Sequence, residues 1–145
     1  MTDHSIIRII VKILLPFILL FAFYVQFHGD LGPGGGFQAG VITASVAVIY
    51  SLVFGSVAAE KLISFSTIRL LIPVGVLIYA GAGLWGLIKG KNYLDYSALH
   101  AEAGVGQHMG IFVVELGVFI TVFATMMTIF YAFVERNRPD EEGSE

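Results

Sequence analysis

Four long apolar segments alternate with short polar ones along this chain. Each has about the 20 apolar residues that a helix, rising about 1.5 Å per residue, needs to cross the hydrocarbon of a bilayer. The segments cover residues 9–27, 37–58, 70–88 and 109–134. None alternates apolar and polar residues with the two-residue period of a barrel strand. The pattern predicts an all-α membrane protein, a bundle of four transmembrane helices.

The composition agrees with this fold class. Hydrophobic residues make up 57% of the 145 positions and charged residues 13%, whereas about 25% of residues are charged in a typical soluble domain. Cysteine is absent, which excludes a disulfide framework and a thiolate metal site. The first segment ends in the bulky and polar YVQFHGD instead of a small-residue cleavage site, so we expect a retained span. We expect one membrane domain at residues 1–135 and a polar cytoplasmic tail at residues 136–145.

Lysine and arginine predict the direction of the spans. With a cytoplasmic N-terminus, the outer side carries only Lys89 and Lys91. The inner side then carries Arg8, Lys12, Lys61, Arg69, Arg136 and Arg138. The positive-inside rule therefore predicts that both termini are cytoplasmic, N-in and C-in. The outer loops are expected at residues 28–36 and 89–107, and the inner connection at residues 59–69.

A glycine-rich run, HGDLGPGGGFQAG at residues 28–40, joins the first two segments. No phosphate-binding fingerprint fits, because no lysine follows the glycines and no strand precedes them. A tight hairpin fits the flanks better, since proline fixes φ and glycine adopts backbone conformations closed to other residues. The glycines that would make this turn are Gly34, Gly35 and Gly36.

The same run has a second interpretation, as an ion site. An irregular backbone at a helix start exposes N–H and C=O groups, which membranes tolerate only inside protein or beside water. Such places in transporters often hold ions. His28 and Asp30 bracket the run and are candidates for an ion or proton path. The sequence leaves the hairpin and the ion site both open.

Small residues recur at four-residue spacing in the second and third segments. The two stripes are Gly36, Gly40 and Ala44, and Ala82, Gly86 and Gly90. Small stripes let helix backbones approach closely in lipid, where packing and not hydrophobicity drives association. We therefore expect both stripes to be helix-packing positions.

Glu115 stands alone among apolar residues in GIFVVELGVFITV. Counted from Met109, it lies about 9 Å inside the fourth span. A charge at the bilayer centre costs about 2.5–3.5 kcal/mol on insertion scales, and somewhat less at this depth. Glu115 must therefore face protein or water, or be protonated. Both a place on an ion or proton path and a purely structural hydrogen-bonding role fit.

His108 lies seven residues before Glu115, on nearly the same helix face. It is a candidate proton relay, because its ordinary pKa is near neutral, and a headgroup-level histidine is the alternative. No Ser/His/Asp set, metal-ligand cluster or haem-binding histidine pair stands out, so we expect neither an enzyme nor a resident cofactor.

The glycine run and the start of the fourth segment carry a family resemblance. HGDLGPGGGFQAGVITAS and QHMGIFVVELGV resemble the corresponding stretches of the MnhB-like subunits of the Mrp (Mnh) multisubunit cation/proton antiporters. Length, the four spans and the polar C-terminus also match. Equivalent membrane modules occur in related respiratory hydrogenase-type complexes.

The resemblance implies an accessory subunit of a multisubunit Na⁺/H⁺ antiporter in the bacterial inner membrane. Its partners would be the other subunits, among them large subunits that resemble those of respiratory complex I, and the lipid bilayer. Na⁺ and H⁺ would be the transported ions, with neither nucleic acid nor a cofactor involved. Such a subunit is required for the assembled antiporter, and Glu115 would line part of the ion path.

Two other functions fit the same residues. One is a structural scaffold whose glycine stripes dock the large subunits without contacting an ion. The other is a membrane-arm subunit of a redox complex, which would need neighbouring subunits with haem, iron–sulfur or flavin motifs, since this chain has none.

Overall fold

The computed structural model describes residues 3–29 and 34–136, and within these ranges the chain is all-helical. The helices are α1 (Asp3–His28), α2 (Gly36–Phe54), α3 (Ser56–Leu62), α4 (Phe65–Ile88), the 3₁₀ turn η1 (Tyr96–Ala98) and α5 (Ala103–Arg136). Four of them are long and apolar enough to cross a membrane: Ser5–His28, Gly36–Phe54, Phe65–Ile88 and Gly104–Arg136. The prediction of an all-α chain with four candidate spans is confirmed.

Several helix boundaries differ from the predictions. Helix α1 begins at Asp3 and not at residue 9, and α4 begins at Phe65 and not at residue 70, so helices occupy most of the connection expected at residues 59–69. The second segment was expected to run to residue 58, but α2 ends at Phe54, because Gly55 takes φ 97° and turns the chain into the short α3. The fourth helix begins at Ala103, six residues before the expected residue 109, so the expected loop at 89–107 is shorter. The polar residues and glycines before Met109 are typical of a loop, so the hydropathy pattern did not predict these helical turns. The tail at residues 137–145 lies outside the described residues.

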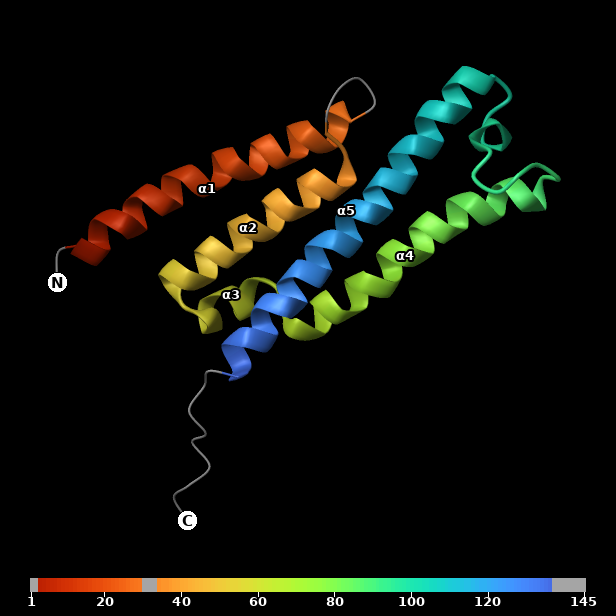
Figure 1. The fold of residues 1–145 in the computed structure, drawn as a ribbon. Helices are drawn as coiled ribbons and strands as arrows, with labels where there is room; N and C mark the ends of the chain where they lie inside the picture. The colour runs from red at the N-terminus through yellow and green to blue at the C-terminus, as the bar shows by residue number, and fades with distance from the viewer. Residues whose placement is uncertain (1–2, 30–33, 137–145) are drawn as a thin grey trace, which may run out of the picture.

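The long helices lie side by side, with α5 packed between α2 and α4 and with α1 on the far side of α2 (Figure 1). The start of α1, the short α3 and the end of α5 share one end of the bundle, and the α1–α2 turn and η1 share the other. In the most apolar window of α1 only 6% of residues are buried, against 22% in each of the other spans. Helix α1 is therefore the most peripheral element.

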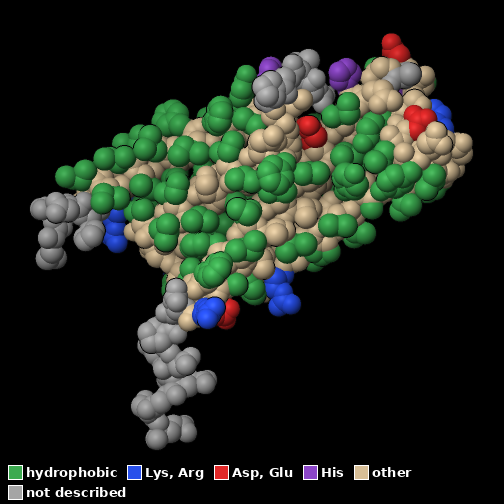
Figure 2. Space-filling view, viewed as in Figure 1, with side chains coloured by type: hydrophobic (Ala, Val, Ile, Leu, Met, Phe, Trp, Pro, Cys, Tyr) green, Lys and Arg blue, Asp and Glu red, His purple; other side chains and the backbone are tan. Residues whose placement is uncertain are grey.

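The face of the molecule seen in Figure 2 is largely hydrophobic along the sides of the bundle, and the charged side chains gather towards its two ends. Large exposed hydrophobic residues occur on all four long helices, for example Phe17, Leu52, Leu77 and Phe133. This distribution suits helices whose sides face lipid or other apolar helices.

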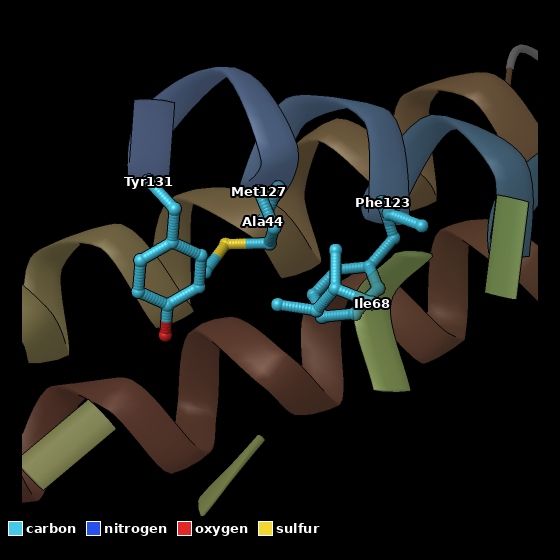
Figure 3. Packing of buried hydrophobic residues seen from close by; sticks show 6 residues of the cluster. Ala44, Ile68, Phe123, Met127 and Tyr131 are labelled. Atoms are coloured by element: carbon cyan, nitrogen blue, oxygen red, sulfur yellow. The ribbon is translucent and has the colours of Figure 1, made fainter. Parts of the chain in front are cut away.

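A compact core lies at the end of the bundle near α3. Its buried members come from α2, α4 and α5: Ala44, Ile68, Phe123, Ala124, Met127 and Tyr131. Figure 3 shows these side chains converging between the helices. Helix α4 is fixed at its start by Ser64, whose hydroxyl accepts a hydrogen bond from the backbone N–H of Thr67 at 3.2 Å.

A groove of about 450 Å³ opens between α1 and the neighbouring helices at this same end. Its lining is almost entirely apolar and includes Leu15, Phe54 and Leu62. Lys12 also lines it, with its ammonium 5.6 Å from the centre of the Phe54 ring. This hollow lies at the opposite end from Glu115.

The expected packing stripe of the third span behaves differently from the prediction. A Cβ atom added to Gly86 would lie 2.6 Å from the backbone oxygen of Asn92, so Gly86 is covered by the loop after α4 and not by another span. Gly90 takes φ 73° in that loop, with open space around it, so its expected place on a helix stripe is wrong. Helices α4 and α5 instead approach at Gly75 and Gly117, where an added Cβ on Gly117 would lie 2.8 Å from the Gly75 oxygen. Ala82 is buried.

Candidate functional site

The turn between α1 and α2 folds back over the end of α1. Helix α1 ends at His28, and the backbone N–H of Gly35 donates a hydrogen bond to the carbonyl oxygen of Val25 at 3.3 Å. Gly35 has φ 114°, a region that side chains disfavour strongly. A Cβ added to Gly34 would lie 3.0 Å from the same Val25 oxygen. Asp30 and Pro33 lie outside the described residues.

The carboxylate of Glu115 lies directly against this turn. A Cβ added to Gly29 would lie 2.7 Å from one carboxylate oxygen of Glu115, and one added to Gly35 would lie 2.7 Å from the other. Real Cβ atoms do not approach other atoms so closely. At Gly29 an added Cβ would also lie 2.8 Å from the Cα atom of Gly35, so a movement of the carboxylate alone would not make room there. The glycines on both sides of the turn therefore leave room for one specific acid, which is half-buried.

Helices α2 and α5 meet immediately below this point. A Cβ added to Gly36 would collide with the carbonyl oxygen of Glu115, and one added to Gly40 would lie 2.9 Å from the carbonyl oxygen of Phe119. Gly36, Gly40 and Ala44 are all buried. The close approach of the α2 and α5 backbones thus fixes the position of Glu115 along the bundle axis relative to the turn.

The carboxylate of Glu115 lies beside the start of helix α2. The first N–H groups of a helix lack partners within the helix, and the helix dipole places partial positive charge there. Helix α2 begins at Gly36, and its N-cap residue Gly35 offers no side-chain acceptor. A carboxylate beside Gly35 supplies negative charge at that end. The same geometry therefore suits a structural acceptor and a site that exchanges ions.

Glu115 lies at different levels relative to the two helices that meet beside it. Helix α2 has 19 residues, about 28 Å at 1.5 Å per residue, close to the hydrocarbon thickness. Glu115 is level with the first residue of α2, while α5 continues past it to Ala103. The turn glycines Gly29 and Gly35 cover the carboxylate at the level of the start of α2.

The candidate histidines occupy different positions at this end. His28, in the last turn of α1, is half-buried and its ring stacks on Tyr24 with the ring centres 5.1 Å apart. His108 is exposed on α5, seven residues before Glu115 and so about 10 Å away along the helix axis. Among the predicted candidates, the glycine turn and Glu115 are brought together, and His108 lies outside that enclosure.

Gln26 is a polar residue of this region that the sequence reasoning missed. Its side chain is 3% exposed, and neither its amide nitrogen nor its amide oxygen has a hydrogen-bond partner among the described residues. It lies in the last turn of α1, three residues before Gly29, which directly follows the end of that helix. In the sequence it resembles an ordinary polar residue at a span end. Only its spacing from the glycine that touches Glu115 could have singled it out.

The loop between α4 and α5 holds a separate polar cluster. Asp95 accepts hydrogen bonds from the backbone N–H of Ser97 at 3.1 Å and from its hydroxyl at 2.6 Å. The Ser97 hydroxyl lowers the pKa of the Asp95 carboxyl, burial opposes this, and the nearby Lys91 charge assists. Burial raises the pKa of the Tyr96 phenol. The Tyr96 ring covers Gly110, where an added Cβ would collide with it, so this cluster holds the extended start of α5 in place.

No group of three or more His, Asp or Glu side chains that could hold a metal ion occurs within residues 3–29 and 34–136. Among the described residues, the site is built from the Glu115 carboxylate and the backbone of the glycine turn. Such a set can bind and release a proton, or contact a hydrated cation, without a covalent step.

Comparisons with known proteins give a consistent picture. The family described as "Domain related to MnhB subunit of Na+/H+ antiporter" matches residues 6–128. A Na(+)/H(+) antiporter subunit of Alkalihalophilus pseudofirmus, designated B, is 31% identical over 133 residues, which cover 85% of this chain and 89% of that protein. The protein of the same name from Bacillus subtilis is 30% identical over 139 residues, covering 88% and 91%. A Staphylococcus haemolyticus protein named putative antiporter subunit mnhB2 is 29% identical over 133 residues, covering 90% and 94%.

Proposed function

This chain belongs to the family of domains related to the MnhB subunit of Na⁺/H⁺ antiporters, and we propose that it is an accessory membrane subunit of a multisubunit Na⁺/H⁺ antiporter. It would act as part of a transporter and not as an enzyme. The names of its relatives favour an antiporter over a hydrogenase-type complex. The four candidate spans agree with a multi-pass protein, for which we propose the bacterial inner membrane.

In this proposal Glu115 lines part of the ion path, and its carboxylate holds a proton or faces a cation in turn. The observation that carries it is the enclosure of the carboxylate by Gly29 and Gly35 at the end of the spans. Glycine at both positions leaves only backbone against the acid, where any side chain would collide with the carboxylate. The N-terminus of α2, at Gly36, lies directly beside the acid.

The partners would be the other antiporter subunits, including large complex-I-like subunits. Helix α1 offers them a nearly unburied apolar surface. The proposed orientation is N-in and C-in, with the glycine turn outside. Among the described residues, Arg8, Lys61 and Arg69 lie at the end shared by the start of α1 and α3, and Lys89 and Lys91 at the other.

A structural scaffold remains the second candidate, because the Glu115 carboxylate beside Gly35 also suits an acceptor that completes the start of α2. Glu115→Gln separates the two. Glutamine keeps the volume and most hydrogen-bonding capacity but cannot ionise.

The experiment restores a strain lacking this subunit with wild-type protein, Glu115→Gln, Glu115→Asp, or Glu102→Gln as the matched control. Glu102 is an exposed acid in the loop before α5. Exchange in vesicles is divided by the amount of assembled complex. We expect Glu115→Gln to assemble normally and lose exchange, Glu115→Asp to keep part of it, and Glu102→Gln to match wild type. Unchanged exchange per complex in Glu115→Gln would reject the ion-path role and leave the scaffold.

A further inference from the structure

The buried amide of Gln26 is costly as it stands. An amide removed from water without a hydrogen bond loses about 1–3 kcal/mol by the measure of protein mutations. Gln26 is 3% exposed, and both ends of its amide are without a partner among the described residues. A buried polar group of this kind calls for an explanation, and an ordered water is the usual one.

The position of Gln26 indicates what that water would connect. Two aromatic pairs link α1 to α5: Phe23 with Phe119, ring centres 6.4 Å apart, and Phe27 with Phe112, ring centres 5.9 Å apart. The helices run in opposite directions, so the stretch of α1 between the pairs faces the stretch of α5 between them. Gln26 lies in the first stretch and Glu115 in the second.

The turn after α1 gives a second indication that the Gln26 amide and the Glu115 carboxylate lie close together. The carboxylate of Glu115 lies against Gly29, the residue that directly follows the end of α1 at His28, and Gln26 lies in the last turn of that helix. The amide and the carboxylate therefore belong to one polar layer, which extends about one helical turn inward from the glycine turn.

We propose that Gln26 and Glu115 hold a water molecule between them, and that Gln26 is a positioning residue for the carboxylate. This inference rests on the proposed role of Glu115 in exchange. The amide oxygen accepts one hydrogen of the water, and the other is donated to the carboxylate oxygen. Glu115 then keeps a hydrogen-bond donor that favours its ionised form.

The direction of the effect follows from hydrogen bonding. A donor to a carboxylate favours the charged form, so losing it raises the pH at which the proton leaves. One hydrogen bond to a charged group corresponds to a shift of about one pH unit. Replacing Gln26 with an apolar residue should therefore move the pH profile of exchange upward by about one unit.

Replacing Gln26 leaves the other titratable groups near Glu115 in place. Helix α1 carries His28 at its end, and α5 carries His108 two turns away. Helix α4 presents Tyr79 beside Gly117, and the titratable residue of α2, Tyr50, lies towards its other end. Asp30 lies outside the described residues. A shift seen on changing the uncharged Gln26 cannot come from altering the number of charges.

The test compares Gln26→Met with Gln38→Met in the assembled antiporter, measuring exchange per complex across pH. Methionine keeps the length of glutamine without its hydrogen bonds, and Gln38 is exposed at the start of α2. We expect the profile of Gln26→Met to shift upward by about one unit and that of Gln38→Met to coincide with wild type. If Gln26→Met does not assemble, Gln26→Leu, with similar volume and high helix propensity, makes the same comparison.

A wild-type profile in the Gln26 variant would overturn the proposal. Greater thermal stability together with an unchanged profile would overturn it more specifically, because an amide without water gains from apolar replacement. Glu115→Gln is measured in parallel. If it is silent, the proposed ion-path role fails; if it abolishes exchange while Gln26→Met keeps the wild-type profile, only the inference about Gln26 fails.

Discussion

Gly36→Ala places one methyl group where α2 and α5 are in backbone contact. The added Cβ would collide with the carbonyl oxygen of Glu115 and lie 3.0 Å from the backbone nitrogen of Phe119. Both are main-chain atoms of a helix, and neither can turn aside as a side chain can. The two helices must therefore move apart, which also lifts the Glu115 carboxylate relative to the glycine turn.

The structure ranks the destabilisation expected from alanine at Gly36, Gly40 and Gly81. Inserting a methyl group into well-packed contacts typically costs about 1–3 kcal/mol, and a contact between two backbones belongs at the upper end. At Gly40 the added Cβ would lie 2.9 Å from the Phe119 oxygen and 3.0 Å from Cβ of Val122, so a smaller helix movement relieves it. At Gly81 nothing lies within 4 Å. There alanine adds helix propensity of about 1 kcal/mol, measured in water.

The assay heats the purified complex in mild detergent and follows the intact fraction by size-exclusion chromatography. We expect the midpoint to fall most for Gly36→Ala, less for Gly40→Ala, and not at all for Gly81→Ala. Equal midpoints for Gly36→Ala and Gly81→Ala would refute the close approach of α2 and α5 at Glu115.

Three further predictions concern the two ends of the bundle. In this cysteine-free chain, Asn92→Cys should react with an impermeant reagent in intact cells and Ser66→Cys only after permeabilisation; the reverse pattern would contradict the N-in orientation. Gly35→Ala and Gly55→Ala both strain a positive φ, but only Gly35 lies against Glu115. Exchange per complex should therefore fall further for Gly35→Ala than for Gly55→Ala. Equal losses of exchange in the two variants would contradict the role of the turn as the cover of Glu115. The pKa of Asp95 is held below its ordinary value of 3.8, so its carboxylate should stabilise the α4–α5 loop above that pH and lose this effect as the pH falls through the lowered pKa. In Asp95→Asn the rate of proteolysis in this loop should no longer depend on pH in that range. A pH dependence equal to that of wild type would exclude Asp95 as its cause.

The spans were predictable because a run of about 20 apolar residues has few structures available to it in a membrane. The start of α5 was not, since the stretch before Met109 contains glycines and polar residues that look like a loop. Its helix is held by contacts with the loop itself: an added Cβ at Gly106 would lie 2.6 Å from the backbone oxygen of Tyr96. Such support cannot be inferred from hydropathy.

The site was predictable in part. The lone acid in an apolar segment and the run of glycines were each recognised as candidates in the sequence. They lie far apart along the chain, and periodicity predicts which residues share a helix face but not which helix faces contact each other. The structure places the Glu115 carboxylate against Gly29 and Gly35. The burial of Gln26 could not be inferred either, because it depends on how α1 lies on its neighbours.

If Glu115 lines the ion path, its carboxyl group should change its protonation when Na⁺ binds. Infrared difference spectra of the purified complex, recorded with and without Na⁺, report the carbonyl band of protonated carboxyl groups. The account predicts a Na⁺-dependent band in wild type that is missing in Glu115→Gln and present in Glu102→Gln. A Na⁺-dependent spectrum that is identical in wild type and Glu115→Gln would contradict it.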